Sequence, residues 1–117
     1  MAAAAAGAEL LVYPGAFNHV TGPVHWELLQ RARALDNQLY VATASPALDP
    51  TFAYQAWGHS TITGPWGNVI ATCERGDALV VGEVNMNWCA DVRRRIALRA
   101  QKRADLYEVV DKTRRDL

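Results

Sequence analysis

The chain has 117 residues, of which half are apolar and 21% are charged, and its formal net charge is zero. This length suits one small globular domain, and the composition excludes an intrinsically disordered chain. A balanced charge gives no global attraction to nucleic acid or to a membrane surface, so neither is expected as a partner.

The first predicted unit is a β-α-β crossover. Residues 9–13 (ELLVY) form a short apolar run that a Pro-Gly pair ends, which is typical of a buried strand. Thr21 is expected to cap a helix over residues 24–37, and residues 39–45 (LYVATAS) are β-rich. Two strands joined by a helix favour a right-handed parallel connection.

The predicted helix carries an apolar face. At about 100° per residue, its apolar side chains share an arc of about 140°. The members of this arc are Val24, Leu28, Leu29, Ala32 and Leu35. Asp36 falls inside the arc, so we expect a structural ion pair with Arg33, three residues earlier. Glu27 and Arg31 fall outside it, as an i,i+4 pair.

A hairpin and a further strand are predicted next. Residues 59–63 and 68–72 flank a Gly-Pro-Trp-Gly turn, which is the pattern of two antiparallel strands. Residues 78–84 (ALVVGEV) are apolar and β-branched, and predict another strand.

The C-terminal part is helical and basic. A helix is expected from Trp88 to about Leu98, with Asn85 or Asn87 as its cap. Residues 1–89 hold three Lys/Arg and seven Asp/Glu, whereas residues 90–117 hold nine and five. We interpret the basic end as a solvated helix face or a subunit contact rather than a site for polyanions.

Together these elements predict one α/β domain over residues 1–117. It has a mixed sheet of about five strands and two main helices. Two helices cannot cover both faces of such a sheet. One face therefore needs either missing chain or a second subunit, and a homo-oligomer is expected.

The two cysteines, Cys73 and Cys89, have neither the number of a disulfide framework nor the spacing of metal ligands. With no secretory signal, a reducing compartment is expected, either the cytoplasm or an organelle if a transit peptide was lost. The dipole of the predicted helix would favour a thiolate at Cys89. No base is adjacent to either cysteine, so both are interpreted as inert.

The remaining polar residues form no motif. His59 and Ser60 are neighbours on a strand, so their side chains are expected on opposite faces. His19 and His25 lack a third ligand, and the glycines form no phosphate loop. We therefore expect no metal and no cofactor.

Four segments resemble the C-terminal half of the nitrilase, or carbon–nitrogen hydrolase, superfamily. They are YPGAFN at 13–18, TGPVHWELL at 21–29 with RARALDN at 31–37, GHST at 58–61 with PWG at 65–67, and QKRADLY at 101–107. The second segment is similar to the omega-amidase branch.

The resemblance implies an α-β-β-α sandwich, of which this chain would form part. It also implies catalysis by a Glu base, an oxyanion-holding Lys and a Cys nucleophile. In the family all three lie further upstream of the PGAFN strand than this chain extends, so no catalytic residue is assigned. Omega-amidases hydrolyse the amide bond of 2-oxoglutaramate and 2-oxosuccinamate.

Two substrate-binding residues follow from the resemblance, Phe17 and Thr21, which match positions that line the 2-oxo acid end. The favoured hypothesis is an omega-amidase-like hydrolase of which this chain is a fragment, inactive alone. One alternative is a short non-catalytic homologue that acts as an assembly partner, and the other is a remnant without function. The C-terminal segment resembles the part of the family that crosses a dimer interface.

Overall fold

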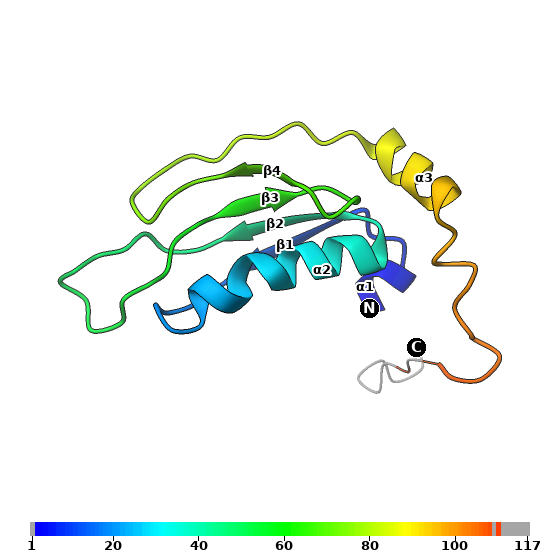
Figure 1. Ribbon diagram of the computed structural model, residues 1–117, viewed down its shortest axis with the longest axis horizontal. Coiled ribbons are helices and arrows are strands. Elements are labelled where there is room, and N and C mark those ends of the chain that lie inside the picture. The colour runs from blue at the N-terminus through cyan, green and yellow to red at the C-terminus, as the bar shows by residue number, and fades with distance from the viewer. Residues whose placement is uncertain (1, 109, 111–117) are drawn as a thin grey trace, which may run out of the picture.

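The computed structural model describes residues 2–108 and 110. A four-stranded mixed sheet lies at its centre, in the order β1-β2-β3-β4, with helix α2 packed across one face (Figure 1). A short helix, α1 (Ala2–Ala5), precedes β1, and α3 (Met86–Arg95) lies at the same end of the sheet, near the start of β1 (Figure 1). The α/β class and the two main helices, α2 and α3, are as predicted.

The β-α-β unit forms as the sequence predicts. β1 (Leu10–Pro14) pairs in parallel with β2 (Tyr40–Ala44), with Leu10 opposite Tyr40. A single π-helical turn, η1 (Gly22–Trp26), leads into α2 (Glu27–Asn37). The helical part of the crossover therefore begins at Gly22, two residues before the predicted helix. The first three residues of that predicted helix, Val24, His25 and Trp26, lie in the wider π-helical turn.

The hairpin is also confirmed. β3 (Thr61–Thr63) and β4 (Val69–Thr72) are antiparallel, and β3 pairs with β2. Gly67 has a φ of +80°, a conformation that a residue without Cβ adopts easily, and its amide donates to the Gly64 carbonyl.

The predicted strand over residues 78–84 does not form, so the sheet has four strands rather than about five. This segment runs in an extended path from the hairpin to α3 (Figure 1). Gly82 lies against the side chains of Ile62 and Ile70, and the Tyr40 hydroxyl donates to the Asn85 carbonyl. Val80 and Gly82 thus lie toward the sheet, whereas Leu79 and Val81 are 88% and 75% exposed, and the segment pairs with none of the four strands.

Helix α2 packs on the sheet through the side opposite to the predicted apolar face. Its buried residues are Trp26 at the end of η1, then Gln30, Ala34 and Asn37. Val24 and Leu28 are instead 61% and 62% exposed. Because the spacing of four, four and three residues keeps the buried set on one stripe, most of the predicted apolar arc faces outward, and only Leu29 at its edge lines a pocket beside the sheet.

Only one of the two predicted charge pairs on α2 forms. Arg31 Nη1 lies 3.2 Å from Glu27 Oε1, as expected. Asp36 is exposed, and no salt bridge to Arg33 is found in the described part of the chain. The outward rotation of the apolar arc puts Asp36 in water, which removes the need for a buried partner.

The end of α2 is tied to α3. Gln38 closes α2 in the left-handed conformation, and its side chain donates to the Ile96 carbonyl at 2.6 Å. Arg93 donates back to the Gln38 carbonyl at 3.2 Å. Asn85 caps α3, as predicted, by accepting from the Asn87 amide.

The chain beyond α3 forms turns that end with Leu106 and Tyr107 exposed. The last part of the predicted basic end, residues 111–117, lies outside the described residues. Among the helices that the structure describes, none is long and apolar enough to cross a membrane.

Candidate functional site

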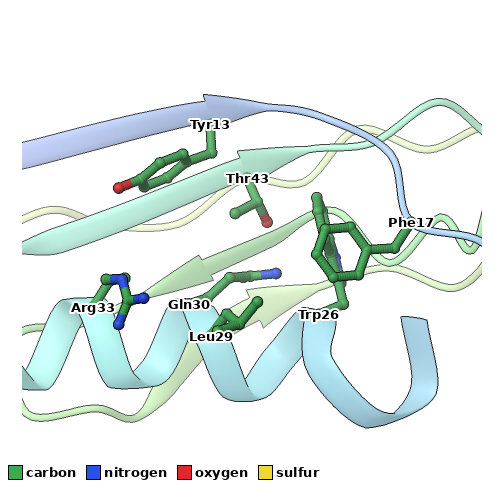
Figure 2. A pocket seen from close by; sticks show the side chains of 7 residues that line it. All are labelled: Tyr13, Phe17, Trp26, Leu29, Gln30, Arg33 and Thr43. Carbon is green, nitrogen blue, oxygen red and sulfur yellow. The ribbon is translucent and has the colours of Figure 1, made fainter. Parts of the chain in front are cut away.

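A pocket of about 190 Å³ lies between α2 and the β1–β2 part of the sheet. Side chains from the first strand, the loop after it, the helix and β2 converge on it (Figure 2). Its lining residues are Tyr13, Phe17, Trp26, Leu29, Gln30, Arg33 and Thr43. The loop that follows a parallel strand supplies one wall, which is where α/β folds commonly place ligands.

One end of the pocket is aromatic. The rings of Phe17 and Trp26 lie 5.1 Å apart at 56°. The Trp26 indole N–H donates to the His59 carbonyl at 2.7 Å, so this buried ring has a fixed orientation. The aromatic end is therefore a rigid apolar wall before any ligand arrives.

Gln30 is the most unusual residue of the pocket. Its side chain is 4% exposed, and neither its Nε2 nor its Oε1 has a hydrogen-bond partner. Figure 2 shows it directed along the pocket toward Trp26. A buried amide without partners loses the hydrogen bonds that water would give it, at a cost of about 1–3 kcal/mol.

The other end of the pocket is open and polar. Arg33 is exposed, and Tyr13 carries its hydroxyl on the same side in Figure 2. The Thr43 hydroxyl is already engaged, because it donates to the Thr61 carbonyl at 3.3 Å. The pocket thus combines apolar walls, one unpartnered amide and a cation at its mouth.

The two residues assigned to substrate binding from the sequence lie in different positions. Phe17 lines the pocket. Thr21 is not among the lining residues, and its hydroxyl donates to Asn18 Oδ1 at 3.1 Å. Thr21 does occupy the cap position before η1, as predicted. Its side chain makes no capping hydrogen bond, however, because its hydroxyl donates to Asn18 instead.

Neither cysteine lines the pocket. Burial raises the pKa of the Cys89 thiol, and the positive charge of Arg93 opposes this only in part. The predicted preference of Cys89 for the thiolate is therefore wrong, since loss of solvation outweighs the helix dipole. The Cys73 thiol is half-buried and donates to the Ser60 carbonyl at 3.6 Å.

The histidine–serine pair forms no dyad. His59 Nδ1 lies 2.7 Å from the Trp57 carbonyl, while the Ser60 hydroxyl donates to the Ser45 carbonyl. Within residues 2–108 and 110, no group of three or more His, Cys, Asp and Glu side chains is arranged to hold a metal ion.

Comparisons with family models and with individual known proteins point to the same family. The family model for carbon–nitrogen hydrolases matches residues 1–94. Omega-amidase NIT2-A of Xenopus laevis is 58% identical over 106 residues, which are 91% of this chain and 38% of the frog protein. The chloroplastic omega-amidase of Arabidopsis thaliana is 57% identical over 113 residues, which are 97% of this chain and 31% of the plant protein.

Solved structures share the fold. Nit3 of Saccharomyces cerevisiae, a member of branch 10 of the nitrilase superfamily, aligns with a TM-score of 0.83 at 40% identity. The alignment covers 87% of this chain and 38% of the yeast chain. The chain thus spans less than two-fifths of the length of each relative named here.

Proposed function

The chain belongs to the carbon–nitrogen hydrolase family, and from this we propose that it is the C-terminal part of an omega-amidase-type hydrolase. Its substrates would be 2-oxoglutaramate and 2-oxosuccinamate, which give the 2-oxo dicarboxylate and ammonia. The observation that carries the proposal is 58% identity to a protein named omega-amidase over nearly the whole chain. The pocket formed by Phe17 within the YPGAFN segment is in keeping with it.

The reaction requires a thiolate and a carboxylate beside the substrate, and the described residues that line the pocket include no cysteine and no carboxylate. A thiolate attacks the amide carbon, ammonia leaves after taking a proton, and water hydrolyses the thioester to regenerate the thiol. A carboxylate moves the protons and a cation holds the oxyanion. We assign these three groups to polypeptide that corresponds to the rest of the relatives' length.

The role proposed for this chain is to supply the substrate pocket. Phe17 provides an apolar wall, held against Trp26. Thr21 and Asn18 fix the loop between β1 and α2, because the Asn18 side chain accepts from the Thr21 amide and hydroxyl. We propose that this loop lines the 2-oxo acid end of the substrate.

A fusion of two parts tests this function. The N-terminal part of the frog relative, up to the point where the match begins, is joined to residues 7–117 of this chain. We expect the fusion to release ammonia from 2-oxoglutaramate, and the 117-residue chain alone to release none. Inactivity of a folded fusion contradicts the proposal.

Two controls make the result specific. Alanine in place of the frog part's nucleophilic cysteine should abolish turnover, whereas Cys73→Ala in the fusion should leave it unchanged. Turnover by the isolated chain that is lost in Cys73→Ala or Cys89→Ala would place the nucleophile within this chain.

The second candidate is a non-catalytic assembly partner, and exposed apolar surface favours it. Val12 on β1 is 63% exposed, and Val24 on η1 and Leu28 on α2 are 61% and 62% exposed. We propose a homo-oligomer for either candidate. Full activity of the fusion argues against a purely structural role.

For the location we propose the cytoplasm, with an organelle as the alternative. The plant relative is named as chloroplastic. Imaging of the tagged full-length gene product in its own cells would decide between the two, and a plastid or mitochondrial signal would reject the cytoplasm.

A further inference from the structure

The sheet ends in two edge strands, β1 and β4, and they differ in their surroundings (Figure 1). The chain that follows β4 runs back past it, and its Gly82 lies against the side chains of Ile70 and Ala71. Helix α2 packs mainly on β2 and β3 rather than on β1. Among the described residues, no strand pairs with the outer side of β1, so the hydrogen-bonding edge of β1 is open.

The pairing of β1 with β2 shows which backbone groups point outward. The Tyr40 amide donates to the Glu9 carbonyl at 2.8 Å, and the Gly15 amide donates to the Ala44 carbonyl at 3.0 Å. The odd-numbered residues of β1 thus bond to β2. Because peptide groups alternate in direction along a strand, the even-numbered residues face away from the sheet.

Three residues of β1 therefore form the open edge. Leu10 and Val12 each present an N–H and a C=O there, whereas Pro14 presents only a C=O. Leu10 is 38% exposed and Val12 is 63% exposed.

β1 lacks the features that usually protect an edge strand. It contains no charged residue, its proline is the last residue, and the irregularity of the described sheet lies between Ile62 and Thr63. An open, apolar and uncharged edge is a template for pairing with another strand.

We propose that β1 pairs with β1 of a second copy of this chain, in antiparallel orientation about a two-fold axis at Leu11. In this register Leu10 lies opposite Val12 of the second copy, and every outward N–H and C=O of these two residues finds a partner. Pro14 falls outside the ladder, so its missing N–H costs nothing. The pairing gives the proposed homo-oligomer a defined interface, and it goes beyond the hydrolase function.

Neighbouring registers fit less well. An axis at Val12 would set Pro14 opposite Leu10 and leave the Leu10 carbonyl unpaired, because proline has no N–H to donate. An axis at Leu10 would set Val12 opposite Ala8, whose amide already donates to the Ala3 carbonyl. The edge is thus complementary to itself in the register centred on Leu11, as a two-fold interface requires.

The side chains suit the same register. Leu11 packs beside Val41 on the side of the sheet that α2 covers, whereas Val12 lines a groove with Ile62 on the opposite side. Directly opposed residues of antiparallel strands share a face, so Leu10 meets Val12 on one face and Leu11 meets its own counterpart on the other. Such apolar cross-strand pairs stabilise a sheet.

The test is amide hydrogen exchange of the 117-residue chain, followed by NMR at several protein concentrations. The Leu10 and Val12 amides should exchange about tenfold more slowly when about nine-tenths of the chain is paired, because only the unpaired copy exposes them. Sedimentation of the same samples gives the paired fraction. The Leu11 amide, which faces β2, is the internal control and should not depend on concentration. Exchange at Leu10 and Val12 that is independent of concentration overturns the proposal.

Two variants at one position separate backbone pairing from side-chain packing. Val12→Pro removes the outward N–H and leaves the bonds to β2 in place, so it should abolish the concentration dependence at Leu10. Val12→Thr keeps the amide and the branched shape, so it should retain that dependence. If Val12→Pro does not fold, the wild-type chain and Val12→Thr still decide the question.

Other interfaces give different results. Association in sedimentation without any change at the Leu10 and Val12 amides places the contact elsewhere, such as the outer side of α2, and overturns the proposal. Protection of these amides only in the fusion with the frog part assigns the edge to the remaining polypeptide, and also overturns it. Ammonia release by the fusion judges the hydrolase function separately.

Discussion

The two cysteines differ in what surrounds their sulfur atoms. Cys89 is fully buried in α3, beside the start of the sheet, whereas Cys73 is half-buried at the end of the hairpin. Since the thiolate is the reactive form, burial suppresses reaction both by blocking access and by raising the pKa.

This difference predicts selective alkylation. In the native chain at mildly alkaline pH, iodoacetamide should modify Cys73 at least about tenfold faster than Cys89, because Cys89 reacts only after local opening. Mass spectrometry of the peptides gives the two rates. The same reaction in denaturant is the control, and there the rates should converge. Equal rates in the folded chain would show that Cys89 is accessible.

The raised pKa of Cys89 also has a consequence for stability. The folded state holds the thiol proton more tightly than the unfolded state does. Its contribution is therefore complete below the ordinary thiol pKa and is lost as the pH rises through and above that value. A Cys89→Ala variant should lack this alkaline decline when unfolding is followed against pH.

At the scale of elements, Gly22 sets how closely the η1 turn approaches the loop before β3. A Cβ at this position would overlap the indole of Trp57. That indole is itself held, because it stacks on His59 at 4.3 Å and lies under the Arg75 guanidinium. The ring has little freedom to move aside.

We therefore expect Gly22→Ala to lower the free energy of unfolding by about 1–3 kcal/mol. Gly15→Ala is the matched control, because a Cβ there meets nothing within 4 Å and should change stability little. Urea denaturation of both variants measures the difference. A Gly22→Ala chain as stable as the wild type would mean that the turn relaxes freely.

Helix α2 has apolar side chains on two sides. Trp26 at the end of η1 and Ala34 are buried, while Val24 in η1 and Leu28 in α2 are more than 60% exposed. A helix that is apolar on both sides is typical of one that is covered from both sides. The outer face is thus expected to meet another polypeptide.

For the whole molecule, this exposed surface predicts association. Apolar patches of this kind mark interaction sites or a tendency to aggregate. We expect sedimentation of the isolated chain to depend on concentration, and Leu28→Glu to shift it toward the monomer. Leu79→Glu is the matched control, since Leu79 is 88% exposed on the segment before α3 and away from α2. A wild-type monomer at all concentrations would reject the prediction.

The sequence alone determined the type and order of most elements, the parallel crossover, the hairpin and the resemblance to carbon–nitrogen hydrolases. These depend on local periodicity, on turn residues and on motif spacing, which are readable along the chain. Phe17 could be named as a pocket residue in the same way, from its place in the YPGAFN segment.

Only the tertiary structure decided which side of α2 meets the sheet. It also decided whether residues 78–84 pair with a strand or run beside the sheet unpaired, and it showed that Gln30 is buried. Periodicity shows that a helix has an apolar side, but contacts with distant residues select the side that packs. Gln30 carried one signal, its four-residue spacing from Trp26 and Ala34. That signal gains meaning only when the sheet shows which stripe of the helix is covered.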